Sequence, residues 1–389
     1  MRYILMQREH EVCAFTYEEN GKDYDFITKT ELIDRGRLPF SIRFREYIAS
    51  SFLEQFLKQR CIPEFRIGTD ALYGEIGNSR IQNSVRAYGL SLSDCYWVKP
   101  ENSRVTWDQL NFFKNQFSYD IGNYMFGIEK KGPDILSPDL TTNGMLPKTW
   151  RRHHGKICLL KGGRKPECLE PYNEAAASVL LKKLNMVPFV EYSLLTLKGQ
   201  TVSVCENFLK DGQEYVPASE IFISEPRPGF FSTDDHLCTR CRELKIPGYK
   251  DFVDRMRYVD LIIGNSDRHL GNFGFLYDTE SMAFTGPAPV FDCGTSFFSS
   301  LDVRSPEEAA REFAEKINKP DRLLAAIQKL PVTEILPEIF ATSGLDAEDI
   351  RDITSEADKR QNAAFEELSK VIQKKKTHNI KKSRTEIER

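Results

Sequence analysis

Three side chains in the second half of the sequence have the chemistry and the spacing that phosphoryl transfer requires. Asp267 and Asn272 lie in the stretch GNSDRHLGN, and Asp292 follows 20 residues after Asn272. Moving a phosphoryl group to a hydroxyl needs a carboxylate near the attacking oxygen, and an amide oxygen and a second carboxylate on magnesium. The pattern therefore predicts that Asp267 orients or deprotonates the nucleophile, and that Asn272 and Asp292 hold the metal.

The elements around this stretch favour a catalytic loop over an ordinary turn. Apolar residues with the spacing of one helix face precede it, at Phe252, Met256, Val259 and Ile263. A short apolar run, a turn-rich segment and a second short run (residues 289–291) then lead to Asp292. The alternative is a polar turn in which Asn265 and Asp267 are simply turn formers. The succession of helix, loop, hairpin and aspartate makes the functional interpretation the stronger one.

The stretch resembles the catalytic loop of HipA-like serine/threonine kinases, and phosphoinositide kinases carry a similar Asp-Arg-His-x-x-Asn. Typical protein kinases place histidine before the aspartate, whereas here Ser266 holds that position and His269 follows. The resemblance covers roughly residues 135–340. It implies a two-lobed α+β protein-kinase-like fold, with a mixed N-terminal lobe and a mostly helical C-terminal lobe, that uses ATP and Mg²⁺.

Two residues beside Asp267 need separate consideration. Arg268 contacts phosphate or faces solvent, and the sequence leaves these alternatives open. Histidine can act as an acid or base near neutral pH. Within such a loop it more often hydrogen-bonds the backbone, so we expect an architectural role for His269.

A candidate phosphate loop comprises Thr141, Thr142, Asn143 and Gly144, in the stretch LTTNGMLPK. It matches neither the GxGxxG pattern nor the Walker pattern. Small hydroxyl residues around a glycine can nevertheless aim backbone N–H groups at phosphates. The resemblance implies that Thr141 or Thr142 stands where some HipA-like kinases carry an autophosphorylated serine. A surface turn between strands is an equal alternative.

Lys161 ends an apolar run, residues 156–161, that predicts a buried strand. A lysine fixed on a strand supplies the cation that the nucleotide phosphates need, and the resemblance identifies Lys161 as that lysine. Asn173 suits the N-cap of the helix that follows. Glu174 would then pair with Lys161 by the same resemblance. Its alternative is a favourable contact with the helix N-terminus, which attracts carboxylates.

A second predicted hairpin ends in the residues that would contact adenine. Runs at residues 190–197 and 201–204 flank Lys198-Gly199-Gln200 and predict two strands. The second strand continues into Glu206 and Phe208. In a kinase this position is the hinge, where backbone groups bind adenine and Phe208 could cover the ring. The alternative is an ordinary strand end.

Composition and charge exclude several classes of function. Hydrophobic residues make up 40% of the chain and charged residues 29%, and the net charge of -3 argues against general nucleic-acid binding. No apolar run approaches the roughly 20 residues of a membrane span, and the early charges argue against a signal peptide. Nine scattered cysteines suit reduced thiols. We therefore expect a cytoplasmic protein with no membrane contact and no direct nucleic-acid partner.

The length predicts two lobes or several subdomains. We expect an N-terminal subdomain of unclear role over residues 1–125, a kinase N-lobe over 126–210, a helical C-lobe over 211–373 and a basic tail over 374–389. Asn20-Gly21 between two alternating runs predicts a β-hairpin. Farther along the first subdomain, the pattern is weaker and predicts a loop over residues 91–98 and a helix over 106–117.

The resemblance implies an ATP-dependent kinase that transfers the γ-phosphoryl group to a serine or threonine of a protein substrate. Autophosphorylation, in which the chain is its own substrate, is a further expectation. Some members of the family act with an antitoxin, so an antitoxin-like partner protein is a further expectation. Two alternatives stay open. One is a lipid or small-molecule kinase on the same fold. The other is a non-catalytic nucleotide-binding module, which the unconventional phosphate loop motivates.

Overall fold

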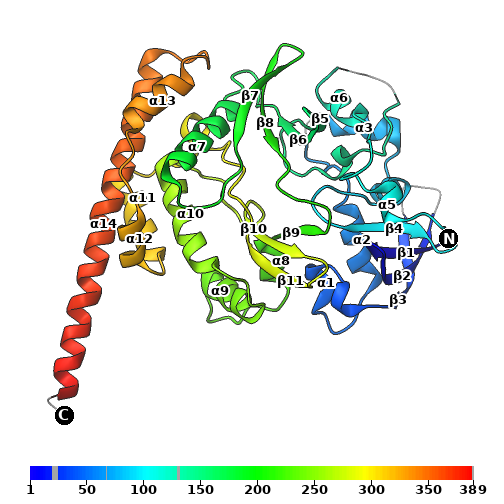
Figure 1. Cartoon of the computed structure of the whole chain (residues 1–389), viewed down its shortest axis with the longest axis horizontal. Helices are drawn as coiled ribbons and strands as arrows, with labels where there is room; N and C mark the ends of the chain where they lie inside the picture. The colour runs from blue at the N-terminus through cyan, green and yellow to red at the C-terminus, as the bar shows by residue number, and fades with distance from the viewer. Residues whose placement is uncertain (20–24, 67, 129–131, 388–389) are drawn as a thin grey trace. The chain divides into compact units, whose positions relative to one another are not determined.

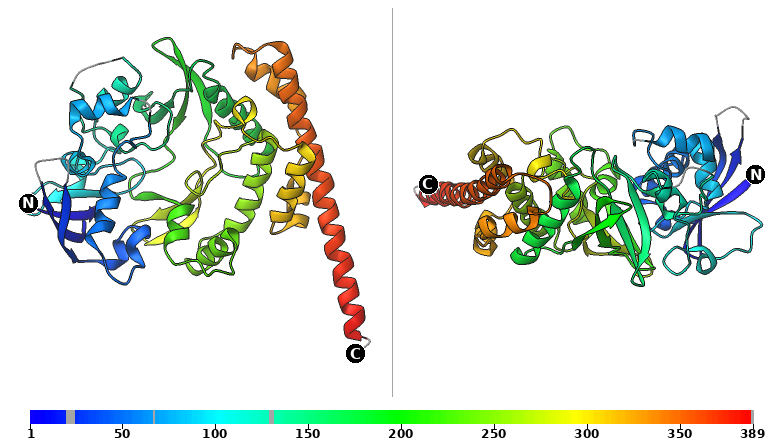
Figure 2. Two further views of the ribbon diagram at one scale, coloured as in Figure 1. Left: turned by 180° about the vertical axis from the view of Figure 1, so that it is seen from behind. Right: turned by 90° about the horizontal axis from the view of Figure 1, so that it is seen from above.

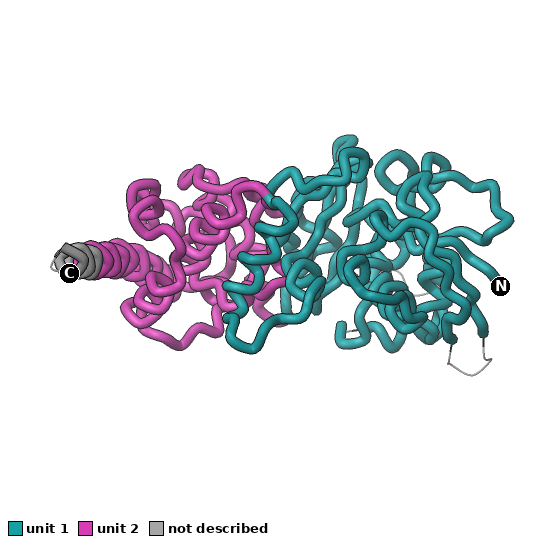
Figure 3. The backbone as a smooth tube through the Cα atoms, turned by 90° about the horizontal axis from the view of Figure 1, so that it is seen from below, with its two compact units in different colours: residues 1–164, 195–246, 274–286 teal, residues 165–194, 247–273, 287–389 magenta. Residues whose placement is uncertain are grey.

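The computed structural model describes residues 1–19, 25–66, 68–128 and 132–387. It is drawn in Figure 1 and, from two further sides, in Figure 2. Contacts divide the chain into two compact units, each built from three separate segments (Figure 3). Unit 1 comprises residues 1–164, 195–246 and 274–286, and unit 2 comprises residues 165–194, 247–273 and 287–389. The subdomain boundaries expected from the sequence remain predictions.

Unit 1 begins with an antiparallel sheet in the order β3-β2-β1-β4. Its strands are β1 (Arg2–Gln7), β2 (His10–Glu18), β3 (Phe26–Leu32) and β4 (Tyr96–Pro100). Pairing of β2 with β3 confirms the predicted hairpin, although its Asn20-Gly21 turn lies outside the described residues. The predicted loop over residues 91–98 is wrong at its end, because β4 pairs with β1. The predicted helix over residues 106–117 shrinks to α5 (Trp107–Leu110).

Each face of this sheet packs on a different core, because side chains alternate along a strand. On one face, Leu5 and Phe15 belong to a buried cluster with residues of α2 (Ser50–Lys58) and α4 (Arg80–Arg86). On the other face, Ile4 and Trp97 pack in a cluster with Trp107 of α5. The sheet is therefore covered on both sides within unit 1.

Two further sheets lie mostly in unit 1. One has the order β5-β6-β8-β7 and contains β5 (Lys148–His153), β6 (Lys156–Lys161), β7 (Tyr192–Leu197) and β8 (Gln200–Glu206). The other has the order β11-β10-β9 and contains β9 (Gln213–Pro217), β10 (Gly274–Asp278) and β11 (Ala283–Pro287). Gly274 is the first residue of β10. A Cβ at this position would lie 2.3 Å from the carbonyl oxygen of Val216, so glycine is needed for the close approach to β9.

The remaining α-helices of unit 1 are short. They are α1 (Phe40–Arg43), α3 (Thr69–Ile76), α6 (Asp120–Met125), α8 (Ala218–Ile223) and α9 (Thr233–Glu243). Because most of them span only one or two turns, tertiary contacts rather than helix propensity must hold them in place.

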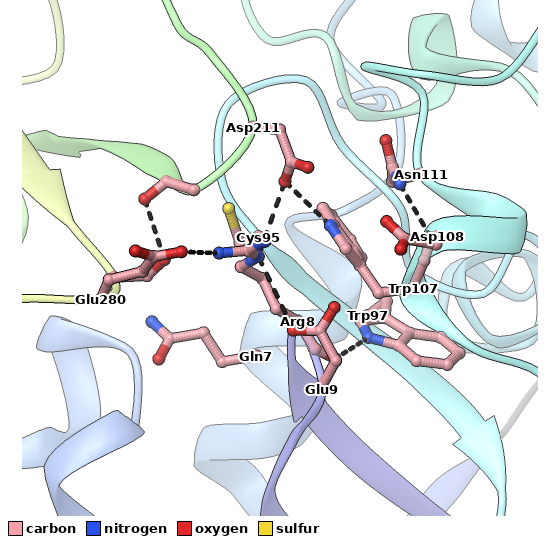
Figure 4. Close-up of polar contacts among 12 residues, drawn as sticks. Gln7, Arg8, Glu9, Cys95, Trp97, Trp107, Asp108, Asn111, Asp211 and Glu280 are labelled. Atoms are coloured by element: carbon pink, nitrogen blue, oxygen red, sulfur yellow. Dashed lines mark hydrogen bonds and ion pairs between the residues drawn. The ribbon is translucent and has the colours of Figure 1, made fainter.

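An ion cluster joins distant segments of unit 1 (Figure 4). Arg8, in the turn between β1 and β2, donates to Glu280 Oε1 at 2.9 Å and lies 3.6 Å from Asp211 Oδ1. Asp211 also accepts a hydrogen bond from Trp107 Nε1 at 2.9 Å. The cluster therefore fixes the β1–β2 turn against α5, the segment before β9 and the β10–β11 turn.

Unit 2 is mostly helical. Its α-helices are α7 (Glu170–Leu184), α10 (Tyr249–Ile263), α11 (Pro306–Lys316), α12 (Pro320–Ala326), α13 (Val332–Phe340) and α14 (Ala347–Ile387). Pro306 and Pro320 occupy first-turn positions of α11 and α12, where a missing N–H is tolerated. Helix α14 packs against α10 to α13 and then continues past them (Figure 2). In the described part of the chain, no helix is both long and apolar enough to cross a membrane.

Candidate active site

The loop that carries Asp267 and Asn272 begins where α10 ends. Gly264 ends the helix with a φ of 63°, a left-handed conformation that glycine adopts without strain. Asp267 is exposed, and its backbone N–H donates a hydrogen bond to Asn265 Oδ1 at 3.1 Å. Asn272 is 8% exposed, and its Nδ2 donates to the carbonyl oxygen of Asp267 at 2.8 Å. The amide nitrogen of Asn272 is thus used within the loop, which leaves its oxygen for a ligand.

The side chain of Arg268 is only 8% exposed. It therefore does not face solvent, and it does not reach the surface, where it could contact a phosphate. Its guanidinium donates to Asp260 Oδ1 at 3.0 Å through one terminal nitrogen. Its other terminal nitrogen donates to the carbonyl oxygens of Asn272 and Phe291, both at 2.7 Å. Burial disfavours the charged guanidinium, but the interactions with Asp260 and Cys293 together outweigh this effect and raise the pKa of Arg268 above its usual value.

The segment that carries Asp292 is held in an unusual backbone conformation. Asp292 has a φ of 58°, in the left-handed region that few residues other than glycine adopt. The next residue, Cys293, is buried, and its Sγ accepts a hydrogen bond from Arg268 at 3.3 Å. Burial raises the pKa of the Cys293 thiol to about 12, so this cysteine remains a neutral thiol.

Helix α7, which also belongs to unit 2, contacts the segment that carries Asp292. Asn173 is fully buried, and its Nδ2 donates to the Gly294 carbonyl at 2.8 Å and to Ser299 Oγ at 3.0 Å. A Cβ at position 294 would lie 3.3 Å from the Cβ of Glu170, so glycine suits this close approach. The residue after Asn173, Glu174, is 3% exposed and lies near enough to Cys293 to raise its pKa.

The predicted N-cap of α7 is wrong. The helix begins at Glu170, with Pro171 in its first turn, so Asn173 lies inside the helix. Proline suits that first turn because it has no N–H to leave unpaired. Glu174 consequently lies beyond the first turn, where the favourable effect of the helix N-terminus on a carboxylate is already weak.

His269 has the architectural role that the sequence predicts. Its backbone N–H donates to the Asp267 carbonyl at 2.9 Å, and its Nδ1 accepts from the Gly271 N–H at 3.0 Å. A Cβ at position 271 would lie 2.8 Å from the imidazole Cε1. Glycine at this position therefore lets the ring fold back onto the loop.

The candidate phosphate loop in unit 1 is held by Arg66, which sequence reasoning missed. The side chain of Arg66 is buried, and its Nε donates to the Gly144 carbonyl at 2.8 Å. Its terminal nitrogens donate to Thr142 Oγ1 at 2.8 Å and to the Thr142 carbonyl at 2.7 Å. All three described bonds go to neutral oxygens, and burial lowers the pKa of Arg66 to about 10.

Two backbone N–H groups of this loop are already used internally. The N–H of Thr142 donates to the Asp139 carbonyl at 3.1 Å, and that of Gly144 donates to Asn143 Oδ1 at 2.8 Å. Thr141 Oγ1 lies 3.1 Å from Ser91 Oγ. For these N–H groups to bind phosphate, as the sequence predicts, the loop would have to rearrange.

The other predicted nucleotide-binding residues also lie in unit 1. Lys161 ends β6, opposite Ser203 of β8, and is 4% exposed. Glu206 ends β8, and its Oε2 accepts from Lys156 at 2.5 Å. The Phe208 ring stacks edge-on against Tyr215 with 6.1 Å between the ring centroids. Residues 141–144, Lys161, Glu206 and Phe208 therefore belong to unit 1, whereas Glu174, Asp267, Asn272 and Asp292 belong to unit 2.

These elements define a mixed α+β, two-lobed fold of the kinase-like class. The chain is similar to HipA of Shewanella oneidensis MR-1, solved with HipB and its operator DNA. That match has a TM-score of 0.57 at 14% identity and covers 95% of this chain and 99% of that one. The proinflammatory kinase CtkA of Helicobacter pylori matches with a TM-score of 0.42 at 19% identity, over 58% of this chain and 94% of that one. No protein-family model and no curated protein matches the sequence. The fold is thus HipA-like.

Proposed function

We propose that the chain is an ATP- and Mg²⁺-dependent kinase that transfers the γ-phosphoryl group to a serine or threonine hydroxyl of a protein. The observation that carries this proposal is the network around Arg268. It joins the loop of Asp267 and Asn272 to the segment of Asp292 within one unit. The HipA-like fold supports the same conclusion, and unit 1 carries a strand lysine, Lys161, at the end of β6.

In this proposal Asp267 accepts a hydrogen bond from the attacking hydroxyl and takes its proton as the phosphoryl group moves. Its exposure leaves the carboxylate accessible to a substrate hydroxyl. Lys161 binds the nucleotide phosphates, and Glu174 keeps the lysine oriented. Glu206 and Phe208 flank the backbone that binds adenine.

Asn272 and Asp292 form the proposed magnesium site. An amide oxygen and a carboxylate are hard oxygen ligands of the kind that Mg²⁺ prefers. The geometry of Asn272 fits this role because its nitrogen is committed to the loop, so its oxygen is the atom presented. When bound at Asn272 and Asp292, the metal would supply positive charge that offsets the negative charge of the nucleotide phosphates.

The test is the intact mass of the protein after incubation with Mg-ATP, with and without a cell extract as acceptor. Whole-phosphate increments in the wild type, or in an extract protein, would support protein phosphorylation, and peptide mapping would then test Thr141 and Thr142. We expect Asp267→Asn to slow the transfer by about 10²–10⁴-fold, the usual contribution of a general base. The exposed Asp321→Asn, at the start of α12, is the matched control and should leave the rate unchanged.

Two outcomes would contradict the proposal. ATP consumption with phosphate transferred only to a lipid or a metabolite would indicate a small-molecule kinase. ATP binding with no consumption, under any acceptor condition, would indicate a non-catalytic nucleotide-binding module.

We also propose that a small antitoxin-like protein binds this chain, because the similar HipA was solved with HipB. Tagging the chain at its own genomic locus and separating the native lysate by size would test this. A stoichiometric second protein that stays with the chain through gel filtration is the expected result. Elution of the chain alone would contradict the partner proposal without affecting the kinase proposal.

A further inference from the structure

A single nitrogen of Arg268 connects the two segments that would supply magnesium ligands. It donates to the carbonyl oxygen of Asn272 and to that of Phe291, at 2.7 Å in each case. Phe291 immediately precedes Asp292. Because both bonds share one donor atom, the two backbones cannot separate or slide without breaking at least one of them. The guanidinium therefore fixes the spacing between the backbones of Asn272 and Asp292.

Asp260 holds the guanidinium in place. Its Oδ1 accepts from a terminal nitrogen of Arg268 at 3.0 Å, and its Oδ2 accepts from Nε at 3.1 Å. The side chains of the pair are 8% and 10% exposed, so the contact is shielded from water and salt. Asp260 Oδ1 also accepts from Asn265 Nδ2 at 2.9 Å. The last turn of α10 thus anchors the start of the catalytic loop as well as its far end.

We infer that the Asp260–Arg268 pair is a positioning device for the metal, which fixes the separation of Asn272 and Asp292 before magnesium binds. This inference rests on the proposed function. Mg²⁺ demands near-ideal octahedral geometry with ligands at about 2.0–2.1 Å, so small errors in ligand separation weaken its binding. Groups that orient metal ligands typically contribute about 10–100-fold in metal affinity.

The competing explanation is that the pair only stabilises the fold, and a second buried arginine–aspartate pair provides a matched control. Arg60 donates to both oxygens of Asp94, at 2.9 and 2.8 Å, and to the Tyr96 carbonyl at 3.1 Å. The side chains of Arg60 and Asp94 are 7% and 19% exposed. The Arg60–Asp94 pair therefore repeats the chemistry of the Asp260–Arg268 pair in unit 1, where none of the proposed metal ligands lies.

The experiment compares two double variants, Asp260→Leu with Arg268→Met and Asp94→Leu with Arg60→Met. Replacing both members of a buried pair by apolar residues avoids an unpaired charge, so both variants should fold. Their affinity for Mn²⁺ alone, measured from the loss of the free-ion paramagnetic resonance signal, reports the site without any turnover. Asp292→Asn, which removes a proposed ligand, gives the reference for a lost site.

We expect the variant of Asp260 and Arg268 to bind Mn²⁺ about 10–100-fold more weakly, and the variant of Arg60 and Asp94 to bind it as the wild type does. In activity assays, raising the Mg²⁺ concentration should restore much of the rate to the first variant. Arg268→Lys keeps the charge but not the planar fork, and it should also weaken Mn²⁺ binding. This single variant carries the test if the double variant does not fold.

Wild-type Mn²⁺ affinity in folded Arg268 variants would overturn the inference and leave the proposed function standing. Equal weakening in both double variants would also overturn it, because the effect would then be general. If the wild type bound no Mn²⁺, or if Asp292→Asn bound it unchanged, the proposed metal site would be wrong and the inference would fall with it.

Discussion

The two candidate loops are each held by a buried arginine, but the two arginines differ in what balances their charge. Arg268, under the catalytic loop, is paired with Asp260, and its pKa is raised. Arg66, under the candidate phosphate loop, donates to three neutral oxygens, and burial lowers its pKa. The first arrangement resists any movement that separates its charges, whereas the second can exchange one neutral partner for another at lower cost. We infer that the candidate catalytic loop is preformed and that the candidate phosphate loop is the easier one to rearrange.

The largest effect should come from removing Asp260 alone. Asp260→Ala leaves the Arg268 guanidinium buried without its carboxylate, and breaking a buried pair in this way usually costs about 3–5 kcal/mol. Urea denaturation should therefore show a loss of that size in the free energy of unfolding. A loss below about 1 kcal/mol, the usual value for a surface pair, would mean that the charge is not buried in solution.

The next effect concerns Asp139, whose backbone carbonyl supports the phosphate loop. Burial raises the pKa of this carboxyl from 3.8 to about 7, although hydrogen bonds from Trp150 N–H and Thr149 oppose the shift. Between those two values the folded state keeps a proton that the unfolded state has lost, so stability falls as the pH rises. The loss approaches about 1.4 kcal/mol per pH unit.

The pH test compares the wild type with Asp139→Asn, which cannot titrate. Measured by urea denaturation from pH 4 to pH 7, the free energy of unfolding of the wild type should fall relative to that of the variant. Parallel curves would show that Asp139 titrates alike in the folded and unfolded states. Arg268 keeps its charge across this pH interval because its pKa is raised, so it adds no pH dependence of its own to the free energy of unfolding.

The smallest effect should come from Arg66→Met. This change leaves the carbonyls of Thr142 and Gly144 without their donor but creates no unpaired charge. An unsatisfied carbonyl costs about 1–3 kcal/mol when it stays buried, but we expect the freed loop to move toward water, which should keep the total loss of stability below about 3 kcal/mol. A loss of stability as large as that of Asp260→Ala would remove the contrast between the two loops.

The sequence predicts that the loop of Asp267 and Asn272 follows a helix, because the signal for this arrangement is local. Asp267 and Asn272 lie five positions apart in one loop, and the helix before them has a clear apolar face. Arg66 was missed because its partner Thr142 is 76 residues away, and no short pattern records such a contact. Asp260 was missed because an acidic residue in an amphipathic helix normally belongs to the exposed face.

The same distinction explains the errors in the fold. The helices after residue 306 are marked by nearby prolines and by a capping box at Ser305. In contrast, β4 exists through its pairing with β1, and Val98 lies opposite Leu5. The start of α7 was misplaced because Asn173, although a good N-cap residue, is used to hold the Gly294 carbonyl. In each case a contact between distant residues overrode the local preference.

The discontinuity of the two units has a consequence for synthesis on the ribosome. Unit 1 needs residues 274–286 to supply β10 and part of β11, so it cannot be completed until two of the three segments of unit 2 have also been made. At about 5–20 residues per second, the strand β9 waits for several seconds before its partner β10 emerges. During that interval the backbone groups of β9 lack their β10 partners, and an unpaired strand edge of this kind can pair with another chain.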